Sequence, residues 1–159
     1  MKTFGIIEED FTNYKLPCMF ISTTTCTFKC EKEAGIKCCQ NSHLINKIPL
    51  DISFEMLYNI YINNPITKSI VIGGLEPFDQ WKEVFDLINY IRVEKGNDDT
   101  IVIYTGYYPE EIDGYIQFLK MFKNIIIKFG RYIPNRNNKY DEILGVTLAS
   151  DNQFAKKIS

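Results

Sequence analysis

Four of the five cysteines lie in one short stretch, TTTCTFKCEKEAGIKCCQN at residues 23–41. Thiols this close together can form disulfides, bind a structural zinc ion or hold an iron–sulfur cluster. Taken alone, the spacing suits zinc loops and iron–sulfur clusters about equally well. The rest of the sequence is therefore needed to decide whether the cysteines form disulfides, bind zinc or hold an iron–sulfur cluster.

The two metal readings need different ligand sets. A zinc ion would take Cys26, Cys30 and Cys39 with either Cys38 or His43 as the fourth tetrahedral ligand. A [4Fe–4S] cluster would take the same first three thiolates on three irons and leave its fourth iron open, with Cys38 as the alternative third ligand.

Composition limits the class of protein. The 159 residues are 45% hydrophobic and 24% charged, which predicts a single globular domain, 1–159. The first ten residues, MKTFGIIEED, do not resemble a signal peptide, and no run approaches the roughly 20 apolar residues of a membrane span. We therefore expect a cytoplasmic protein without a membrane partner, where disulfides are rare. The net charge of −2 and scattered basic residues argue against nucleic acid as a partner.

Strands and helices are expected to alternate along the chain. Short apolar runs predict strands at residues 18–23, 68–72, 100–104 and 124–128, with 143–148 either a fifth strand or an irregular tail. Apolar residues at helical spacing predict a helix from Ser53, with Asp51 or Ser53 as its N-cap, and another from Pro77. Pro109 and the two acidic residues after it predict the start of a third helix. This order indicates βαβ units and a mainly parallel sheet. Cys18 falls inside the first strand, where we expect it to be buried.

Unusual residues follow each of the four predicted strands. These segments are the cysteine stretch, Gly73-Gly74-Leu75-Glu76-Pro77, Thr105-Gly106-Tyr107 and Gly130-Arg131. Because parallel α/β folds bind ligands at the carboxyl ends of their strands, we expect the four segments to meet in one site. The charged residues at 29–33 are expected to form a solvated loop.

Several of these segments together carry a family resemblance. They are Cys26-TFK-Cys30, Cys39-Gln40-Asn41, Gly73-Gly74-Leu75-Glu76-Pro77, Tyr104-TGY, Lys128-FGRY and Ala149-SDNQ. With them, nearly the whole chain resembles the radical S-adenosylmethionine (radical SAM) enzymes. Within that superfamily it is most similar to the activating proteins of the anaerobic, glycyl-radical ribonucleoside-triphosphate reductase.

The chain departs from the family pattern at two places. The family spacing is C-x3-C-x2-C, whereas eight residues separate Cys30 from Cys39 here. We favour Cys39 over Cys38 as the third ligand, because Gln40-Asn41 follows it as the closing residues of the family motif would. The second departure is Leu75, which is inserted before the acidic residue of the glycine-rich segment.

The resemblance implies a partial open (β/α) barrel, an oxidoreductase activity and two cofactors, a [4Fe–4S] cluster and SAM. SAM would chelate the open iron through its amino and carboxylate groups and be cleaved to methionine and a 5′-deoxyadenosyl radical. No catalytic residue beyond the cluster is implied. The residues implied to bind SAM are Gly73, Gly74, Glu76, Thr105, Tyr107 and Asn152.

The resemblance also implies partners. The radical would be transferred to a glycine of a glycyl radical enzyme such as the anaerobic ribonucleotide reductase. An electron donor such as flavodoxin or ferredoxin would reduce the cluster. Two alternatives stay open: a radical SAM enzyme that acts on a small molecule or peptide, and a zinc-stabilised binding module without catalytic chemistry.

Overall fold

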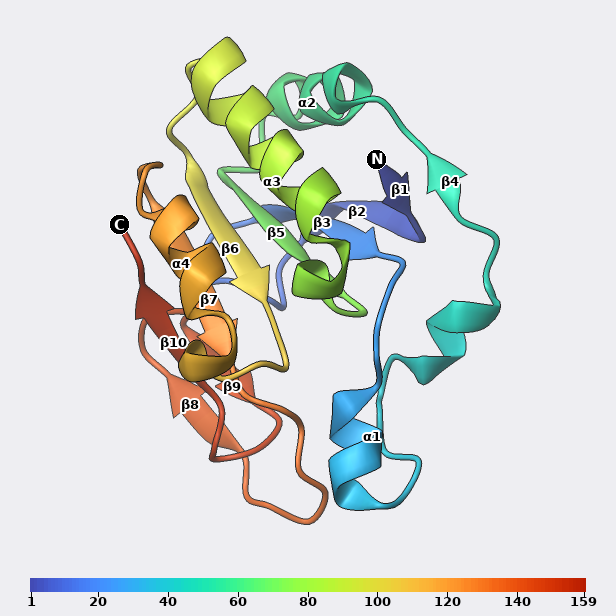
Figure 1. The fold of residues 1–159 in the computed structure, drawn as a ribbon. Coiled ribbons are helices and arrows are strands. Elements are labelled where there is room, and N and C mark those ends of the chain that lie inside the picture. The colour runs from blue at the N-terminus through green and yellow to red at the C-terminus, as the bar shows by residue number, and fades with distance from the viewer.

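A six-stranded sheet forms the centre of the molecule, in the strand order β10-β7-β6-β5-β3-β2 (Figure 1). The computed structural model describes residues 1–159. The four inner strands are parallel and are β3 (Cys18–Thr23), β5 (Ser69–Gly74), β6 (Thr100–Tyr104) and β7 (Ile125–Phe129). These are the four strands that the apolar runs predict.

Two antiparallel strands that the sequence reading missed form the edges of the sheet. They are β2 (Gly5–Asp10), which pairs with β3, and β10 (Phe154–Lys157), which pairs with β7. Both carry charged residues and are largely exposed or half-buried, so neither shows the apolar run of a buried strand. The first lies before the cysteine stretch and the second is close to the carboxyl terminus.

The three predicted helices are present, but two begin later than expected. Of the two candidate N-caps, Ser53 caps α2 (Phe54–Asn63) by accepting a hydrogen bond from Met56 N at 3.1 Å. Pro77 and Pro109 instead begin 3₁₀ turns, η2 (Pro77–Gln80) and η4 (Pro109–Glu111). These turns lead into α3 (Trp81–Asn89), which continues as the π-helical turn η3 (Tyr90–Glu94), and into α4 (Asp113–Leu119).

Two other segments correct the sequence reading. Residues expected as a solvated loop form the short helix α1 (Lys29–Ala34), which ends at Gly35 with a positive φ of 67°. The segment at 143–148 gives β9 (Val146–Leu148), which pairs with β8 (Lys139–Asp141) in a separate hairpin and not with the main sheet. The remaining elements are η1 (Ser42–Asn46) and the pair β1 (Lys2–Thr3) and β4 (Leu50–Asp51).

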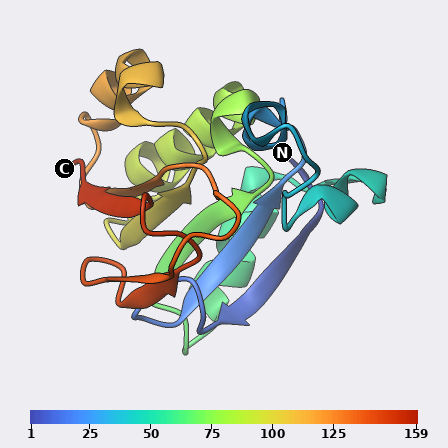
Figure 2. The ribbon, with the colours of Figure 1, turned by 90° about the horizontal axis from the view of Figure 1, so that it is seen from below.

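The two faces of the sheet are covered differently. Side chains at alternate positions, such as Ile70 and Ile72, pack with the helices in the larger apolar core. Val71 between them faces the other side, where Leu144 and Leu148 of the β8–β9 region complete a smaller cluster. Figure 2 shows α3 and α4 on one side of the sheet and the β8–β9 hairpin on the other. Cys18 belongs to the smaller cluster and is fully buried, as expected.

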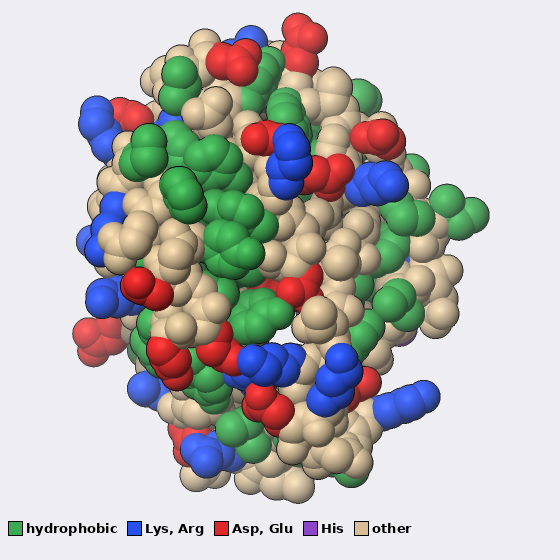
Figure 3. Space-filling model, viewed as in Figure 1, with side chains coloured by type: hydrophobic (Ala, Val, Ile, Leu, Met, Phe, Trp, Pro, Cys, Tyr) green, Lys and Arg blue, Asp and Glu red, His purple; other side chains and the backbone are tan.

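An aromatic cluster joins α3 to α4 on the outside of the molecule. Trp81 stacks on Phe78 with ring centroids 5.6 Å apart, and it lies 4.6 Å from Tyr115 of α4. Phe85 continues the cluster toward Phe118, at 6.1 Å. Hydrophobic side chains gather over the two helices in Figure 3. None of the helices has the length and apolar character that a membrane crossing requires.

Gly74 closes β5 in a position that only glycine fits. Its φ is +90°, and a Cβ atom there would lie 2.2 Å from Ser22 Oγ of β3. We expect Gly74→Ala to lower the free energy of unfolding by about 1–3 kcal/mol, because it adds both backbone strain and overlap. Urea denaturation monitored by circular dichroism measures this change.

Gly114 in α4 provides the matched control. A Cβ atom there would meet nothing within 4 Å, so Gly114→Ala should raise the free energy of unfolding by about 0.5–1 kcal/mol through better helix propensity. Equal effects of the two substitutions would contradict the account of Gly74.

Candidate functional site

A cavity of about 370 Å³ opens at the carboxyl edge of the parallel strands. All four segments that follow these strands contribute to it, as their positions in the sequence predict. Its volume is in the range of small-molecule sites. The lining residues used below are Cys26, Cys30, Cys39, Gly74, Glu76, Tyr104, Thr105, Lys128 and Arg131.

Three of the clustered thiols lie on this cavity. Cys26 Sγ accepts a hydrogen bond from Phe28 N at 3.2 Å, and Phe28 takes a left-handed φ of 51° next to it. Burial raises the pKa of Cys26 to about 12. A hydrogen bond from the Cys30 thiol lowers the pKa of Cys39 to about 6 and raises that of Cys30. Cys39 is therefore the thiol that most readily gives the thiolate form, which binds metals.

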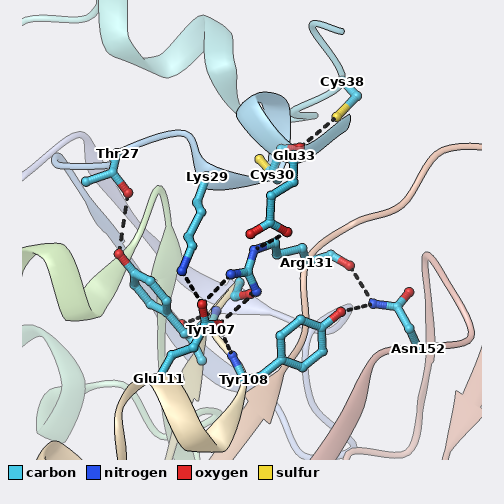
Figure 4. Close-up of polar contacts among 12 residues, drawn as sticks. Thr27, Lys29, Cys30, Glu33, Cys38, Tyr107, Tyr108, Glu111, Arg131 and Asn152 are labelled. Carbon is cyan, nitrogen blue, oxygen red and sulfur yellow. Dashed lines mark hydrogen bonds and ion pairs between the residues drawn. The ribbon is translucent and has the colours of Figure 1, made fainter. Parts of the chain in front are cut away.

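Cys38 is oriented differently from its neighbour Cys39. Its Sγ lies 3.9 Å from the backbone oxygen of Cys30 (Figure 4), and it does not line the cavity. Cys39 lines the cavity, and its backbone N–H donates to Glu31 Oε1 at 3.1 Å. The geometry thus favours Cys39 as the partner of Cys26 and Cys30.

Glu76 is a buried carboxylate that connects the ends of two strands. Its Oε1 accepts hydrogen bonds from Thr105 Oγ1 at 2.7 Å and Phe78 N at 3.1 Å, and its Oε2 accepts from Gly106 N at 2.8 Å. Burial raises the pKa of Glu76 to about 7, although these three donors favour the ionised form. The backbone N–H of Glu76 donates to Thr25 O at 2.9 Å, so this residue also holds the chain just before Cys26.

The 3₁₀ turn after Glu76 holds the cysteine segment at two further points. Gln80 Oε1 accepts from Thr24 N at 2.7 Å, and Asp79 Oδ2 accepts from Thr27 N at 2.6 Å. The same Asp79 carboxylate accepts from Tyr107 OH at 2.6 Å. Because these side chains serve the backbone on both sides of Cys26, the position of this thiol depends on the turn at 77–80.

An ion-pair network fixes α1 against the sheet edge (Figure 4). Arg131, which is only 5% exposed, binds both carboxylate oxygens of Glu111, at 2.5 and 2.8 Å, and lies 3.0 Å from Glu33 of α1. Lys29 of α1 also pairs with Glu111. Burial acts to raise the pKa of Glu111, but the hydrogen bonds from Arg131 and Lys29 hold it down at about 2. The helix that carries Cys30 is thus attached to the loops after β6 and β7.

The sequence-predicted SAM residues separate into two groups. Gly74, Glu76 and Thr105 line the cavity with the three thiols. Gly73 does not line it, and its carbonyl accepts from Thr23 Oγ1 at 2.9 Å. Tyr107 lines a small adjoining pocket of about 40 Å³ together with Cys26 and Cys30.

Asn152 supports the site from outside the cavity lining. Its Nδ2 donates to Arg131 O at 2.8 Å and to Tyr108 OH at 3.1 Å, while its Oδ1 is buried without a hydrogen-bond partner. Asn152 thus links the backbone at Arg131 to the side chain of Tyr108 and stabilises the loop after β7.

Sequence reasoning did not name Asp79, Gln80 or Lys128 as site residues, although Lys128 begins one of the segments that carry the family resemblance. Asp79 and Gln80 lie in the first turn after Pro77, close behind the glycine-rich segment. Their polar side chains at that place were the signal that could have marked them as site residues. Lys128 interrupts the otherwise apolar strand IIIKF. Because lysine is rarely buried, its presence in an apolar strand was a signal that could have been read from the sequence.

Comparison with known protein families gives one match. Residues 17–153 match the model of the 4Fe-4S single cluster domain. Searches of curated proteins and of solved structures return no match. The matched range contains every residue that lines the cavity except Thr12 and Asn13.

Glu111→Gln should release α1 from the sheet edge, because it removes the charge that faces the buried Arg131. We expect a loss of about 1–3 kcal/mol in the free energy of unfolding at pH 7. Amide hydrogen exchange should become faster in α1 than in the central strands. Because the pKa of Glu111 is lowered from 4.5 to about 2, its stabilising contribution is present above pH 4.5 and lost as the pH falls toward 2.

An exposed ion pair supplies the control for this substitution. Lys82 and Asp86 pair on the surface of α3 with side chains 87% and 40% exposed, so Asp86→Asn should change stability by no more than about 0.5 kcal/mol. If Glu111→Gln left both the exchange of α1 and the acid dependence of stability unchanged, the network would not hold this helix.

Proposed function

The chain belongs to the family of 4Fe-4S single cluster domains, and we propose that it is a radical SAM enzyme. It uses a [4Fe–4S] cluster to cleave SAM and installs a glycyl radical on an anaerobic ribonucleotide reductase or a similar partner. One observation carries the proposal. The thiols of Cys26, Cys30 and Cys39 line the same cavity as Gly74, Glu76 and Thr105, although these residues come from three separate segments of the chain.

The donor set fits a cluster with one open iron. Cys26, Cys30 and Cys39 supply three thiols, the ligand type of iron–sulfur clusters, and the long gap between the last two is taken up by α1 and the turn after it. Cys26 Sγ accepts a backbone N–H, a contact that favours the thiolate form. The cavity beside the thiols has space for a further ligand.

Gly74, Glu76 and Thr105 would form the SAM side of the cavity. Gly74 lines the cavity with its backbone, and its carbonyl accepts from Asn41 Nδ2 at 2.9 Å. Glu76 already accepts three protein hydrogen bonds, so it mainly orients the loops and leaves only its remaining lone pairs to a ligand amino group. When bound, the cluster and SAM together supply reductive cleavage of the sulfonium to methionine and a 5′-deoxyadenosyl radical.

We propose that the sheet is the partial open barrel of radical SAM enzymes, with the cavity face as its interior. The helices cover the other face, and the β8–β9 region covers the cavity face only in part. A segment of a partner polypeptide would enter from this side and place a glycine near the SAM subsite. A small redox protein such as flavodoxin or ferredoxin would supply the electron.

A single zinc ion receives less support from the geometry. It would need four ligands around one point, and no group of three or more His, Cys, Asp or Glu side chains is arranged to hold one metal ion. A cluster places no such demand, because each thiolate binds a different iron.

Substitution of single cysteines tests the ligand assignment. Cys26→Ala, Cys30→Ala and Cys39→Ala should each abolish assembly of a stable cluster, because the two remaining thiolates leave two of the four irons without a protein ligand. Cys38→Ala is the matched control, since this residue is adjacent to Cys39 but does not line the cavity, and it should keep the cluster. The readouts are iron and sulfide content and the Mössbauer spectrum after anaerobic reconstitution. Loss of the cluster in Cys38→Ala but not in Cys39→Ala would reverse the assignment.

The proposed reaction has its own test. Reconstituted and reduced protein given SAM should form 5′-deoxyadenosine, and formation should require Cys26. Addition of a glycyl radical enzyme should then give a glycyl signal in electron paramagnetic resonance. Formation of 5′-deoxyadenosine without transfer to such an enzyme would favour a small-molecule or peptide substrate. Bound zinc and no 5′-deoxyadenosine would favour the binding module.

A further inference from the structure

The segment that carries Cys30 and Cys39 has an outer surface that the site does not use. Residues 29–48 contain α1 and η1, and neither helix has a buried residue. Figure 1 shows this segment beside the sheet, at the end where β3 and β5 finish. A protein bound to its outer surface would be separated from the two thiols only by the chain that carries them.

The acidic residues of this segment are already paired. Glu31 Oε1 accepts a hydrogen bond from the backbone N–H of Cys39 at 3.1 Å. Glu33 points toward Arg131, at 3.0 Å (Figure 4). Residues 29–48 hold no other acidic side chain, so both negative charges are engaged within the site.

Three lysines of the same segment have no such partner. Lys32, Lys37 and Lys47 are exposed, and none of them forms an ion pair. Residues 29–48 hold four lysines against two glutamates, whereas the whole chain has a net charge of −2. The outer surface beside the ligand thiols is therefore positive on a chain that is negative overall.

Exposed isoleucines lie among these lysines. Ile36, Ile45 and Ile48 are 57%, 51% and 88% exposed. Figure 3 shows hydrophobic and basic side chains reaching the surface on this side of the molecule. A single exposed apolar side chain is ordinary, but three of them within residues 36–48 are unusual for a face that only meets water. Apolar groups bordered by charge are typical of protein interfaces.

We propose that Lys32, Lys37 and Lys47, with the exposed isoleucines, form the docking surface for the redox protein that reduces the cluster, and that this protein presents an acidic face. The inference rests on the proposed function, because the cluster is the electron acceptor. One electron leaves the reduced donor and takes the cluster from its 2+ to its 1+ state, so a flavodoxin donor passes from hydroquinone to semiquinone.

The position of this surface suits the electron donor better than the polypeptide substrate. Electron transfer slows steeply with distance, so the donor has to bind close to Cys30 and Cys39. Complementary charge steers such brief encounters between proteins. The polypeptide substrate must instead reach Gly74 and Thr105, which line the cavity on the inner side of the segment.

The rate of reduction by flavodoxin tests this surface. The reconstituted protein is mixed with the hydroquinone of an acidic flavodoxin in an anaerobic stopped-flow instrument, and the absorbance change gives the second-order rate constant. Lys32→Gln, Lys37→Gln and Lys47→Gln together should lower this constant at least about tenfold at low ionic strength. The difference should vanish near 1 M salt, where the Debye length falls to about 3 Å. A rate constant of the unsubstituted protein that does not fall with salt would overturn the proposal without any variant.

Conservative and distant substitutions are the controls. Arginine at the same three positions keeps the charge and should keep the rate constant. Lys68 precedes β5, and Lys156 and Lys157 lie in the edge strand β10; all three are exposed and form no ion pair. Their combined change to Gln removes the same charge far from the thiols and should lower the rate constant by less than about twofold. Equal losses in the two Gln variants would mean that only net charge matters, and the proposal would fail.

A small reductant separates this inference from the proposed function. Photoreduced 5-deazaflavin should reduce the cluster equally well in the unsubstituted protein and in the variant with Gln at the three surface positions. If 5′-deoxyadenosine forms with this reductant but flavodoxin reduces both proteins equally fast, only the inference fails. If flavodoxin reduces both equally fast and the variant alone loses the glycyl signal, the surface binds the glycyl radical enzyme and the inference is wrong. If reduction depends on the lysines but no 5′-deoxyadenosine forms, the radical chemistry fails while the docking surface stands.

Discussion

The arrangement of the site depends on the buried carboxylate of Glu76. It accepts donors from Thr105, Gly106 and Phe78, and its own backbone N–H holds Thr25. A carboxylate buried this deeply is stable only when its oxygens are paired, so the loops after β5 and β6 must stay together around it. The segment before Cys26 is tied to the same point. The side chain and the backbone N–H of this one residue thus fix the relation between the glycine-rich loop, the end of β6 and the segment before Cys26.

A second constraint comes from the long gap between Cys30 and Cys39. A flexible insertion between two ligands would add loop entropy to any shared site. The chain reduces this cost by folding part of the insertion into α1 and pairing Lys29 and Glu33 with Glu111 and Arg131. The guanidinium group of the buried Arg131 donates to both carboxylate oxygens of Glu111. Such a bidentate pair fixes the relative orientation of the two side chains.

The two faces of the sheet serve different purposes. The helix side has a continuous apolar core that supplies most of the hydrophobic stabilisation. On the opposite side the apolar cluster is smaller, and polar and charged groups such as Lys128 are buried beside the cavity. Buried groups that reduce stability are typical of functional sites, where they persist because a ligand completes their interactions. The polarity of the cavity face therefore fits a binding role.

The sequence by itself determined the four parallel strands, the cysteine ligand candidates and the edge at which the loops meet, because apolar runs, turn residues and strand direction are local signals. It narrowed the cap of α2 to Asp51 or Ser53, and the structure chose Ser53. The sequence did not reveal the edge strands, the helix within the insertion, the late start of α3 or the contact of Cys38 with the backbone oxygen of Cys30. Only the tertiary structure decided those, along with the pairing of Arg131 and the burial of Lys128 beside the cavity. Each depends on side chains that are distant in sequence, and local periodicity carries no information about which of them will meet.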